Sequence, residues 1–142
     1  MPARTDTLMS IVIHHNPGCG TSRNVLEIIR AFVEEPIVID YLTTGWTRGQ
    51  LQGLFAAAGL TPRDALRVSK TPAEELGLTD ASVSDEVILE AMLEHPVLVN
   101  RPIVCTPKGV ALCRPSEAVF ALLDVASGST YTKEDGEVII AP

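Results

Sequence analysis

Cys19 has the surroundings of a reactive thiol. It lies in the segment HHNPGCGTSRN (residues 14–24), directly after an apolar run at residues 11–13 and before an amphipathic stretch at residues 25–33. This order predicts a strand, a tight loop and a helix, with Cys19 at the start of the helix. Backbone N–H groups at a helix start have no partner within the helix, and the helix dipole adds partial positive charge there. Both effects favour the thiolate, which is the nucleophilic form of cysteine.

Small residues on both sides of the thiol predict room for an anion. Gly18 and Gly20 let a ligand approach the backbone, so the N–H groups of Gly20, Thr21 and Ser22 can form a cradle for it. Ser22 completes a Cys-x-x-Ser spacing, which has the geometry of a dithiol redox motif without its second sulfur. The Ser22 hydroxyl can donate a hydrogen bond to the sulfur, or it can satisfy the first turn of the helix. An intramolecular disulfide cannot form at this spacing, so a resolving thiol must come from elsewhere.

Two histidines end the predicted strand before the thiol. Side chains alternate along a strand, so His14 and His15 point to opposite faces of the sheet. We expect one of them to face Cys19, where an imidazolium would lower the pKa of the thiol. We expect the other to be exposed to solvent.

Arginines provide candidate ligands for an oxyanion. Arg101 precedes Pro102, which favours an extended conformation, and Arg114 follows a predicted hairpin strand. Arg67 lies in a predicted helical segment, where Arg63 competes for the same role. Two or three guanidinium groups around one thiolate predict a multidentate oxyanion pocket.

The remaining cysteines, Cys105 and Cys113, flank a predicted hairpin turn. We interpret them as half-buried strand residues, and a resolving role for Cys113 is the alternative. Three cysteines is an odd number, and the chain has no Cys-x-x-Cys or Cys/His metal spacing, so we expect neither a disulfide framework nor a metal site. Free thiols are typical of a reducing compartment, so we predict a cytoplasmic protein. We also expect no bound cofactor.

The composition is that of one folded domain. The chain has 142 residues, of which 46% are hydrophobic and 20% charged, and its formal net charge is −7. This charge argues against a general nucleic-acid or anionic-membrane surface, although a few arginines in one cleft can still bind an anion. No apolar run approaches the length of a membrane span. We expect residues 1–9 to be a flexible lead and residues 10–140 to form a single domain.

The elements that must position these residues fall into three groups. Residues 10–41 predict a βαβ unit with a parallel crossover. Residues 47–95 predict a helical insert, with helices that begin near Thr47, Thr61, Thr71 and Ser84. Residues 97–123 predict strands with a hairpin turn at 107–109 and a closing helix, and residues 132–137 predict one helical turn.

The fold class that this order predicts is α/β. It resembles the thioredoxin-like fold, with a mixed central sheet and a helical insertion between the βαβ and ββα halves. In such a fold the proline before the third strand lies against the active-site cysteine and is typically cis. Pro102 is the matching residue, which would bring Arg101 to the site.

Taken together, the motifs resemble those of the glutaredoxin-dependent arsenate reductases. The resemblance runs from Ile11 to Glu137 and rests on an ordered set of short motifs. These are HNPGCGTSRN at 15–24, EELGL at 74–78, HP at 95–96, NRPIV at 100–104, LCRPSE at 112–117 and KEDGE at 133–137. The family usually has an aromatic residue where His14 stands.

The resemblance implies a role for each matching residue. Cys19 would be the nucleophile, His15 rather than His14 would tune it, and Ser22 would belong to the same site. The oxyanion ligands would be Arg67, Arg101 and Arg114, with the backbone of Gly20 and Thr21. The implied activity is the reduction of arsenate to arsenite through a covalent Cys19–arsenic intermediate, with glutathione and a glutaredoxin as electron donors.

Other functions on this fold class fit the residues less well. A redox-sensing transcription regulator that binds RNA polymerase generally carries a Cys-x-x-Cys pair and lacks the arginines, so Ser22, Arg101 and Arg114 argue against it. A general glutathione-disulfide oxidoreductase acts on a substrate that needs no oxyanion pocket. A phosphatase of the Cys-x5-Arg type is excluded because Val25 stands six residues after Cys19.

Overall fold

The computed structural model describes residues 10–142, and the predicted lead at residues 1–9 lies outside them. The described chain divides into two compact units. The first unit consists of residues 10–40 and 101–142, and the second is Tyr41–Asn100. The helical insert predicted at residues 47–95 lies within the second unit. Within residues 10–142, we find no helix that is both long enough and apolar enough to cross a bilayer.

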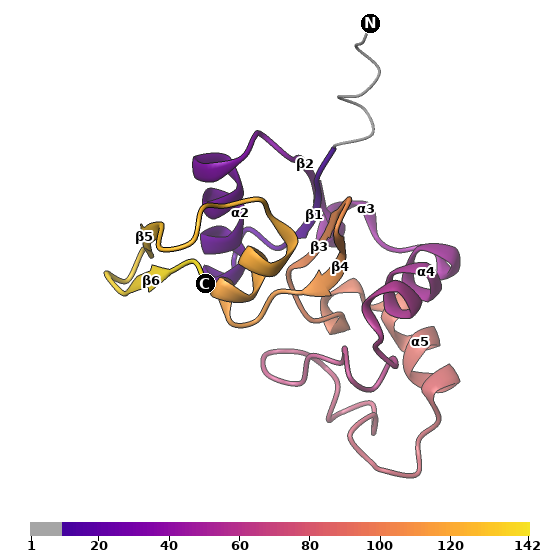
Figure 1. Ribbon diagram of the computed structural model, residues 1–142. Helices are drawn as coiled ribbons and strands as arrows, with labels where there is room; N and C mark the ends of the chain where they lie inside the picture. The colour runs from indigo at the N-terminus through magenta and orange to yellow at the C-terminus, as the bar shows by residue number, and fades with distance from the viewer. Residues whose placement is uncertain (1–9) are drawn as a thin grey trace, which may run out of the picture. The chain divides into compact units, whose positions relative to one another are not determined.

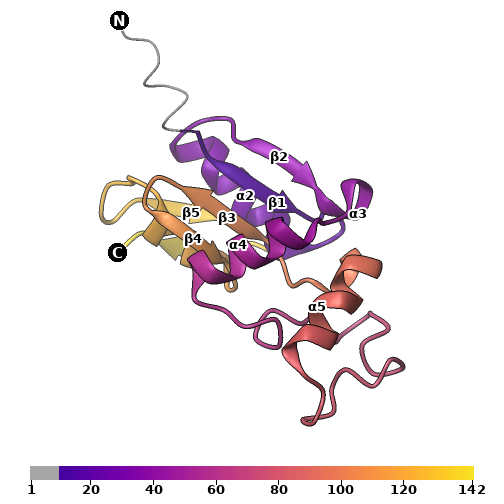
Figure 2. The same cartoon turned by 90° about the vertical axis from the view of Figure 1, so that its right-hand side faces the viewer.

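A four-stranded mixed sheet forms the centre of the first unit. Its strands are β1 (Val12–His15), β2 (Ile37–Asp40), β3 (Ile103–Thr106) and β4 (Gly109–Leu112). They are arranged in the order β2-β1-β3-β4, which can be followed in Figure 2. β2 runs parallel to β1, with His15 opposite Asp40, whereas β3 is antiparallel to both β1 and β4. The predicted βαβ unit and the predicted β3–β4 hairpin are both confirmed.

Helix α2 (Gly20–Phe32) connects β1 to β2 and packs against the sheet. Apolar residues at helical spacing, Val25, Ile28 and Ile29, are completely buried on one face. They join one continuous core with Ile13 of β1 and residues of η2 (Ser116–Leu122). Burial of this stripe fixes the start of α2, and therefore Cys19, relative to the end of β1.

The C-terminal part of the first unit differs from the prediction in two ways. The closing helix is the 3-10 helix η2. Residues 132–137, for which one helical turn is predicted, instead connect strand β5 (Thr130–Thr132) to strand β6 (Val138–Ile140) in a hairpin. The β-branched, alternating pattern of β6 explains the difference, because Ile139 enters the core while Val138 and Ile140 remain exposed. Figure 1 shows this hairpin beside α2.

The second unit contains α3 (Tyr41–Thr44), α4 (Arg48–Ala58), α5 (Asp85–Glu94) and η1 (Pro96–Leu98). Thr47 and Gln50 form the predicted capping box of α4, and the Ser84 side chain accepts a hydrogen bond at the start of α5. The prediction of two short helices after Thr61 and Thr71 is wrong, because residues 61–83 form successive turns. The Arg63 guanidinium stabilises these turns by donating to the carbonyls of Leu78, Asp80 and Val83.

Candidate active site

Cys19 occupies the N-cap position of α2, as its spacing predicts. Its backbone is extended, with φ −108° and ψ 123°, and its carbonyl accepts the first helical bond, from Arg23 N–H at 2.9 Å. The preceding loop is held by Asn16, whose carbonyl accepts from Cys19 N–H at 3.0 Å and whose Oδ1 accepts from Gly18 N–H at 2.9 Å. This turn directs the Cys19 side chain toward the free N–H groups of the first helical turn.

The pKa of the Cys19 thiol is lower than its usual value. Burial of the sulfur acts against the thiolate and would raise the pKa. Four groups together outweigh this effect of burial and lower the pKa. They are, in order of size, the hydrogen bond from the Ser22 backbone N–H, the positive charge of Arg101, the hydrogen bond from the Arg114 side chain and the hydrogen bond from the Thr21 backbone N–H. Two of the backbone N–H groups predicted for the anion cradle and two of the predicted arginines therefore lower the pKa of this thiol.

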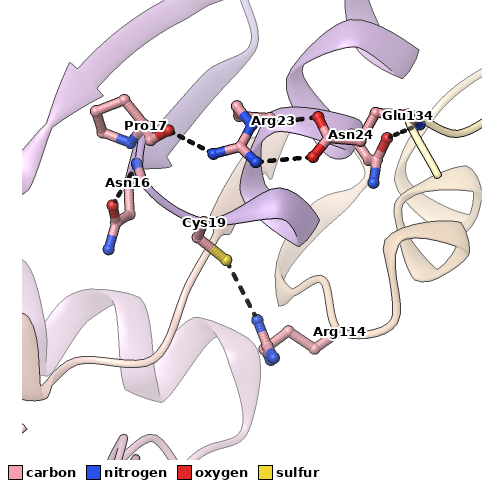
Figure 3. Close-up of polar contacts among 8 residues, drawn as sticks. Asn16, Pro17, Cys19, Arg23, Asn24, Arg114 and Glu134 are labelled. Carbon is pink, nitrogen blue, oxygen red and sulfur yellow. Dashed lines mark hydrogen bonds and ion pairs between the residues drawn. The ribbon is translucent and has the colours of Figure 1, made fainter. Parts of the chain in front are cut away.

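The Arg114 guanidinium forms a hydrogen bond to the Cys19 sulfur. Its Nη1 lies 3.7 Å from Cys19 Sγ and also donates to the carbonyl oxygen of Arg101 at 3.2 Å (Figure 3). The Arg101–Pro102 bond is cis, as the fold resemblance implies, and the Arg114–Pro115 bond is cis as well. The ends of β3 and β4 therefore bring two guanidinium-bearing residues, far from Cys19 in sequence, to the same sulfur.

Ser22 contacts His15 through its hydroxyl. Ser22 Oγ accepts from Asn16 N–H at 3.1 Å and lies 2.6 Å from His15 Nδ1. The hydroxyl thus fixes the loop and the imidazole, while the Ser22 backbone N–H reaches the sulfur. The pKa of His15 is lowered, chiefly by burial; Asp40 opposes this shift and Arg30 and Arg23 add to it. Neutral His15 would hold Ser22 in place rather than act as an imidazolium.

The expectation that one of the two histidines is exposed to solvent is wrong. His14 and His15 are both only 6% exposed, and burial also lowers the pKa of His14. The reason is the position of β1, which is a central strand with β2 on one side and β3 on the other. A strand end at the sheet centre is covered more completely than a strand end at the edge.

Arg67 and Arg63 lie in the second unit. Arg67 Nε donates to the Ser69 carbonyl at 2.9 Å, and its backbone N–H donates to Leu98 O at 2.8 Å. Arg63 donates to three carbonyls of the 78–83 turns, so its guanidinium has a structural use. The role of Arg67 as an oxyanion ligand, with Arg63 as the alternative, stays a prediction.

The thiol pKa values of the other two cysteines are raised. Cys113 is completely buried, its Sγ lies 3.7 Å from the Ala111 carbonyl oxygen, and burial raises its pKa to about 12. Cys105 is partly buried, and burial raises its pKa too. A thiol that stays protonated at neutral pH is a poor resolving nucleophile, which favours the simple interpretation of Cys113 as a core residue. Among residues 10–142, no cluster of three or more His, Cys, Asp or Glu side chains could hold a metal ion.

Three residues near Cys19 were missed by the sequence analysis. Arg23 donates to the Pro17 carbonyl and to both oxygens of Glu134, and Asn24 Oδ1 accepts from the Glu134 N–H (Figure 3). Arg23 and Asn24 lie within the Cys19 motif, but Glu134 is 111 positions from Arg23. The KEDGE motif at 133–137 contains Glu134, but it supported only the family resemblance and gave no role for the residue.

The assembled site can bind and attack a tetrahedral oxyanion. It provides a thiolate-prone sulfur, backbone donors from Thr21 and Ser22, and positive charge from Arg101 and Arg114. Charged fork-shaped donors are suited to anions with several equivalent oxygens.

Comparison with known proteins agrees with this chemistry. The model of the ArsC family matches residues 14–122. An arsenate reductase of Synechocystis sp. is 63% identical over 130 residues, which cover 92% of this chain and 93% of that protein. An arsenate reductase of Escherichia coli is 48% identical over 133 residues, 94% of each. The structure of an arsenate reductase from Vibrio cholerae superposes with a TM-score of 0.76 at 38% identity, over 81% of this chain and 98% of that one. The predicted thioredoxin-like α/β fold class is confirmed.

Proposed function

Because this chain belongs to the ArsC family, we propose that it is an arsenate reductase that uses Cys19 to reduce arsenate to arsenite in arsenic detoxification. The observation that carries this proposal is the Cys19 sulfur, which receives backbone donors from Thr21 and Ser22 and lies 3.7 Å from Arg114. A disulfide substrate would need no such set of cationic groups around the nucleophile. Family membership likewise favours the enzyme over a redox-sensing regulator of the same fold.

Binding comes first in the proposed mechanism. Arsenate is a tetrahedral anion at neutral pH, and the guanidinium groups of Arg101 and Arg114 offset its charge. Arg67 would provide a third guanidinium. The donors that favour the Cys19 thiolate also stabilise the negative charge that spreads over the arsenic oxygens during attack.

The covalent step makes one bond and breaks another. The Cys19 thiolate attacks arsenic, an S–As bond replaces an As–O bond, and the displaced oxygen leaves as water after taking up protons. Arsenic stays in its oxidised state in this step. Phosphate has a similar shape and charge and would bind weakly, but it would not be reduced.

Electrons come from a second thiol in the proposed sequence. With serine at position 22, glutathione would enter as a co-substrate, and no cofactor would be bound. The glutathione sulfur attacks the Cys19 sulfur, an S–S bond forms, and arsenic keeps the electron pair of the broken S–As bond and leaves as arsenite. A glutaredoxin would then reduce the mixed disulfide. Three free cysteines suit such chemistry in a reducing cytoplasm.

A coupled assay tests the proposal. Arsenate-dependent consumption of reducing equivalents is measured with glutathione and a glutaredoxin, and in parallel with a thioredoxin system in their place. We expect turnover in the first mixture, inhibition by millimolar phosphate, and little turnover in the second. Turnover that does not depend on arsenate, or no turnover with either donor system, would refute the proposed activity.

A further inference from the structure

The hairpin turn between β5 and β6 reaches back to the start of the nucleophile's helix. Arg23 of α2 donates from Nη2 to Glu134 Oε1 at 2.7 Å and from Nε to Oε2 at 3.2 Å, a two-bond arrangement of guanidinium and carboxylate. The backbone N–H of Glu134 donates to Asn24 Oδ1 at 3.0 Å, so two consecutive residues of α2 hold the same turn residue. Figure 3 shows these contacts next to Cys19.

Arg23 also holds the loop that leads to the nucleophile. Its Nη1 donates to the carbonyl oxygen of Pro17 at 2.9 Å, two residues before Cys19. One guanidinium therefore joins the Cys19 loop, the first turn of α2 and the distant hairpin. Loss of this side chain would release the Pro17 carbonyl and leave the loop held by the hydrogen bonds of Asn16, including the one that its N–H donates to Ser22 Oγ.

Glu134 places a negative charge close to the same helix start. A Cβ atom at Gly20, the first residue of α2, would lie only 3.2 Å from Glu134 Oε1 and 3.6 Å from Arg23 Nη2. A carboxylate there would compete with the Cys19 thiolate for the positive potential of the helix end. Arg23 neutralises it at short range: their hydrogen bond lowers the pKa of Glu134 and raises that of Arg23.

We propose that Arg23 and Glu134 are a pair of positioning residues: Arg23 fixes the Pro17 carbonyl and neutralises Glu134, so that the turn can dock beside Gly20 without opposing the Cys19 thiolate. The inference rests on the proposed use of that thiolate as the nucleophile. The other charged groups that act on the sulfur are Arg101 and Arg114 at the ends of β3 and β4. His15 of β1 contacts Ser22, and Asp40 of β2 lies opposite it and acts on the imidazole.

The test measures the Cys19 pKa itself and needs no arsenate. The rate of alkylation of Cys19 by iodoacetamide is followed against pH by peptide mass spectrometry in the full-length protein, for Arg23→Gln, Glu134→Gln and the double variant. We expect Arg23→Gln to raise the pKa by about half a unit, because Glu134 is left unpaired. Glu134→Gln should leave the pKa equal to or below that of the wild type, and the double variant should fall between the two single variants.

Conservative and matched variants separate charge from loop anchoring. Arg23→Lys keeps the charge, so the Cys19 pKa should stay near that of the wild type, while the lost Pro17 contact lowers kcat/KM about tenfold. The exposed ion pair Arg30–Glu35 begins on the same helix but at its other end, and Arg30→Gln with Glu35→Gln should leave the Cys19 pKa unchanged.

Two results would overturn the inference. One is an equal Cys19 pKa in the wild type, Arg23→Gln and Glu134→Gln. The other is a double variant whose pKa is raised as far as that of Arg23→Gln, which would mean that Glu134 exerts no charge effect. The thiol pKa can shift as expected even if arsenate is not the substrate, so failure of the proposed function remains distinguishable.

Discussion

Cys19 and Cys113 are both buried in the first unit, yet the pKa values of their thiols move in opposite directions. Cys19 is 7% exposed and its pKa lies below the usual value, whereas Cys113 is 0% exposed and its pKa is raised to about 12. Burial acts in the same direction on both sulfurs, because it disfavours the charged form. The difference must therefore come from the polar groups around each sulfur.

Those groups follow from where each cysteine lies in its element. Cys19 begins a helix, where N–H groups point at the side chain. Cys113 follows strand β4, its backbone N–H donates to Pro102 O, and its sulfur lies near the Ala111 carbonyl, which accepts and cannot stabilise a thiolate. The next residue, Arg114, turns its guanidinium to Cys19. Neighbouring donors, rather than exposure, therefore decide which of the two thiols has the lowered pKa.

Replacing Cys19, the proposed nucleophile, tests this comparison most severely. We expect Cys19→Ser to reduce arsenate turnover by roughly 10³-fold or more, because a serine hydroxyl is far weaker as a nucleophile at neutral pH. The coupled assay measures the loss, and circular dichroism checks that the variant is folded. Appreciable residual turnover would show that a different sulfur carries the reaction.

Removing the guanidinium that bonds to Cys19 should have the next largest effect. Arg114→Ala should lower kcat/KM by about 10²-fold, since it deletes a cationic donor from the proposed oxyanion pocket, and it should raise the Cys19 pKa. Arg114→Lys keeps a positive charge but not the fork that reaches both Cys19 and the Arg101 carbonyl, so it should recover only part of the loss. A wild-type kcat/KM in Arg114→Ala would show that the oxyanion does not bind at Arg114.

The sequence allowed us to predict Cys19 and its helix, because strand–loop–helix patterning and capping are local. It predicted the β3–β4 hairpin for the same reason, through the turn residues at 107–109. The turns at residues 61–83 could not be anticipated, because Arg63 bonds there to carbonyls as many as 20 positions away. Local proline signals favour a helix at these positions, and they carry no information on the long-range contacts that one guanidinium makes there.

At the site itself, the backbone donors were predictable and the side-chain partners were not. The N–H groups of Thr21 and Ser22 follow from the helix start alone. The choice of His15 Nδ1 as the partner of the Ser22 hydroxyl depends on how β1 and α2 pack. The Arg23–Glu134 contact depends on a hairpin where local patterning favours a helical turn.

The raised pKa of Cys113 makes the stability of the folded protein depend on pH, an effect that we expect to be smaller than the losses of activity above. Its pKa is higher in the folded protein than the ordinary value of 9.0, so the folded state retains a proton that the unfolded state loses. This contribution is complete below pH 9, and the free energy of unfolding should fall by about 1.4 kcal/mol per pH unit as the pH rises from 9 towards 12. The contribution of Cys19 to the free energy of unfolding has the opposite dependence on pH, since its lowered pKa stabilises the folded state above pH 9.

Urea unfolding at pH 8 and pH 10 measures this contribution. The wild type should lose more stability between the two pH values than Cys113→Ala, in which the titrating group is absent. Alanine suits the completely buried site, because it introduces no polar group, although it should cost about 1–2 kcal/mol at pH 8 through the lost packing. Equal losses in both proteins would mean that Cys113 titrates normally, and the contrast with Cys19 would then disappear.

The smallest effect on activity is expected when both strand cysteines are replaced. Cys105→Ser combined with Cys113→Ala should leave kcat/KM for arsenate unchanged within about twofold, because burial raises the pKa of both thiols and neither sulfur acts as a nucleophile at neutral pH. The assay is run well below the melting temperature of the variant, so that the packing loss at residue 113 does not affect the rate. An inactive but folded double variant would show that one of these sulfurs resolves the Cys19 intermediate, and reactivity would then depend on movement of the hairpin as well as on the donors around each thiol.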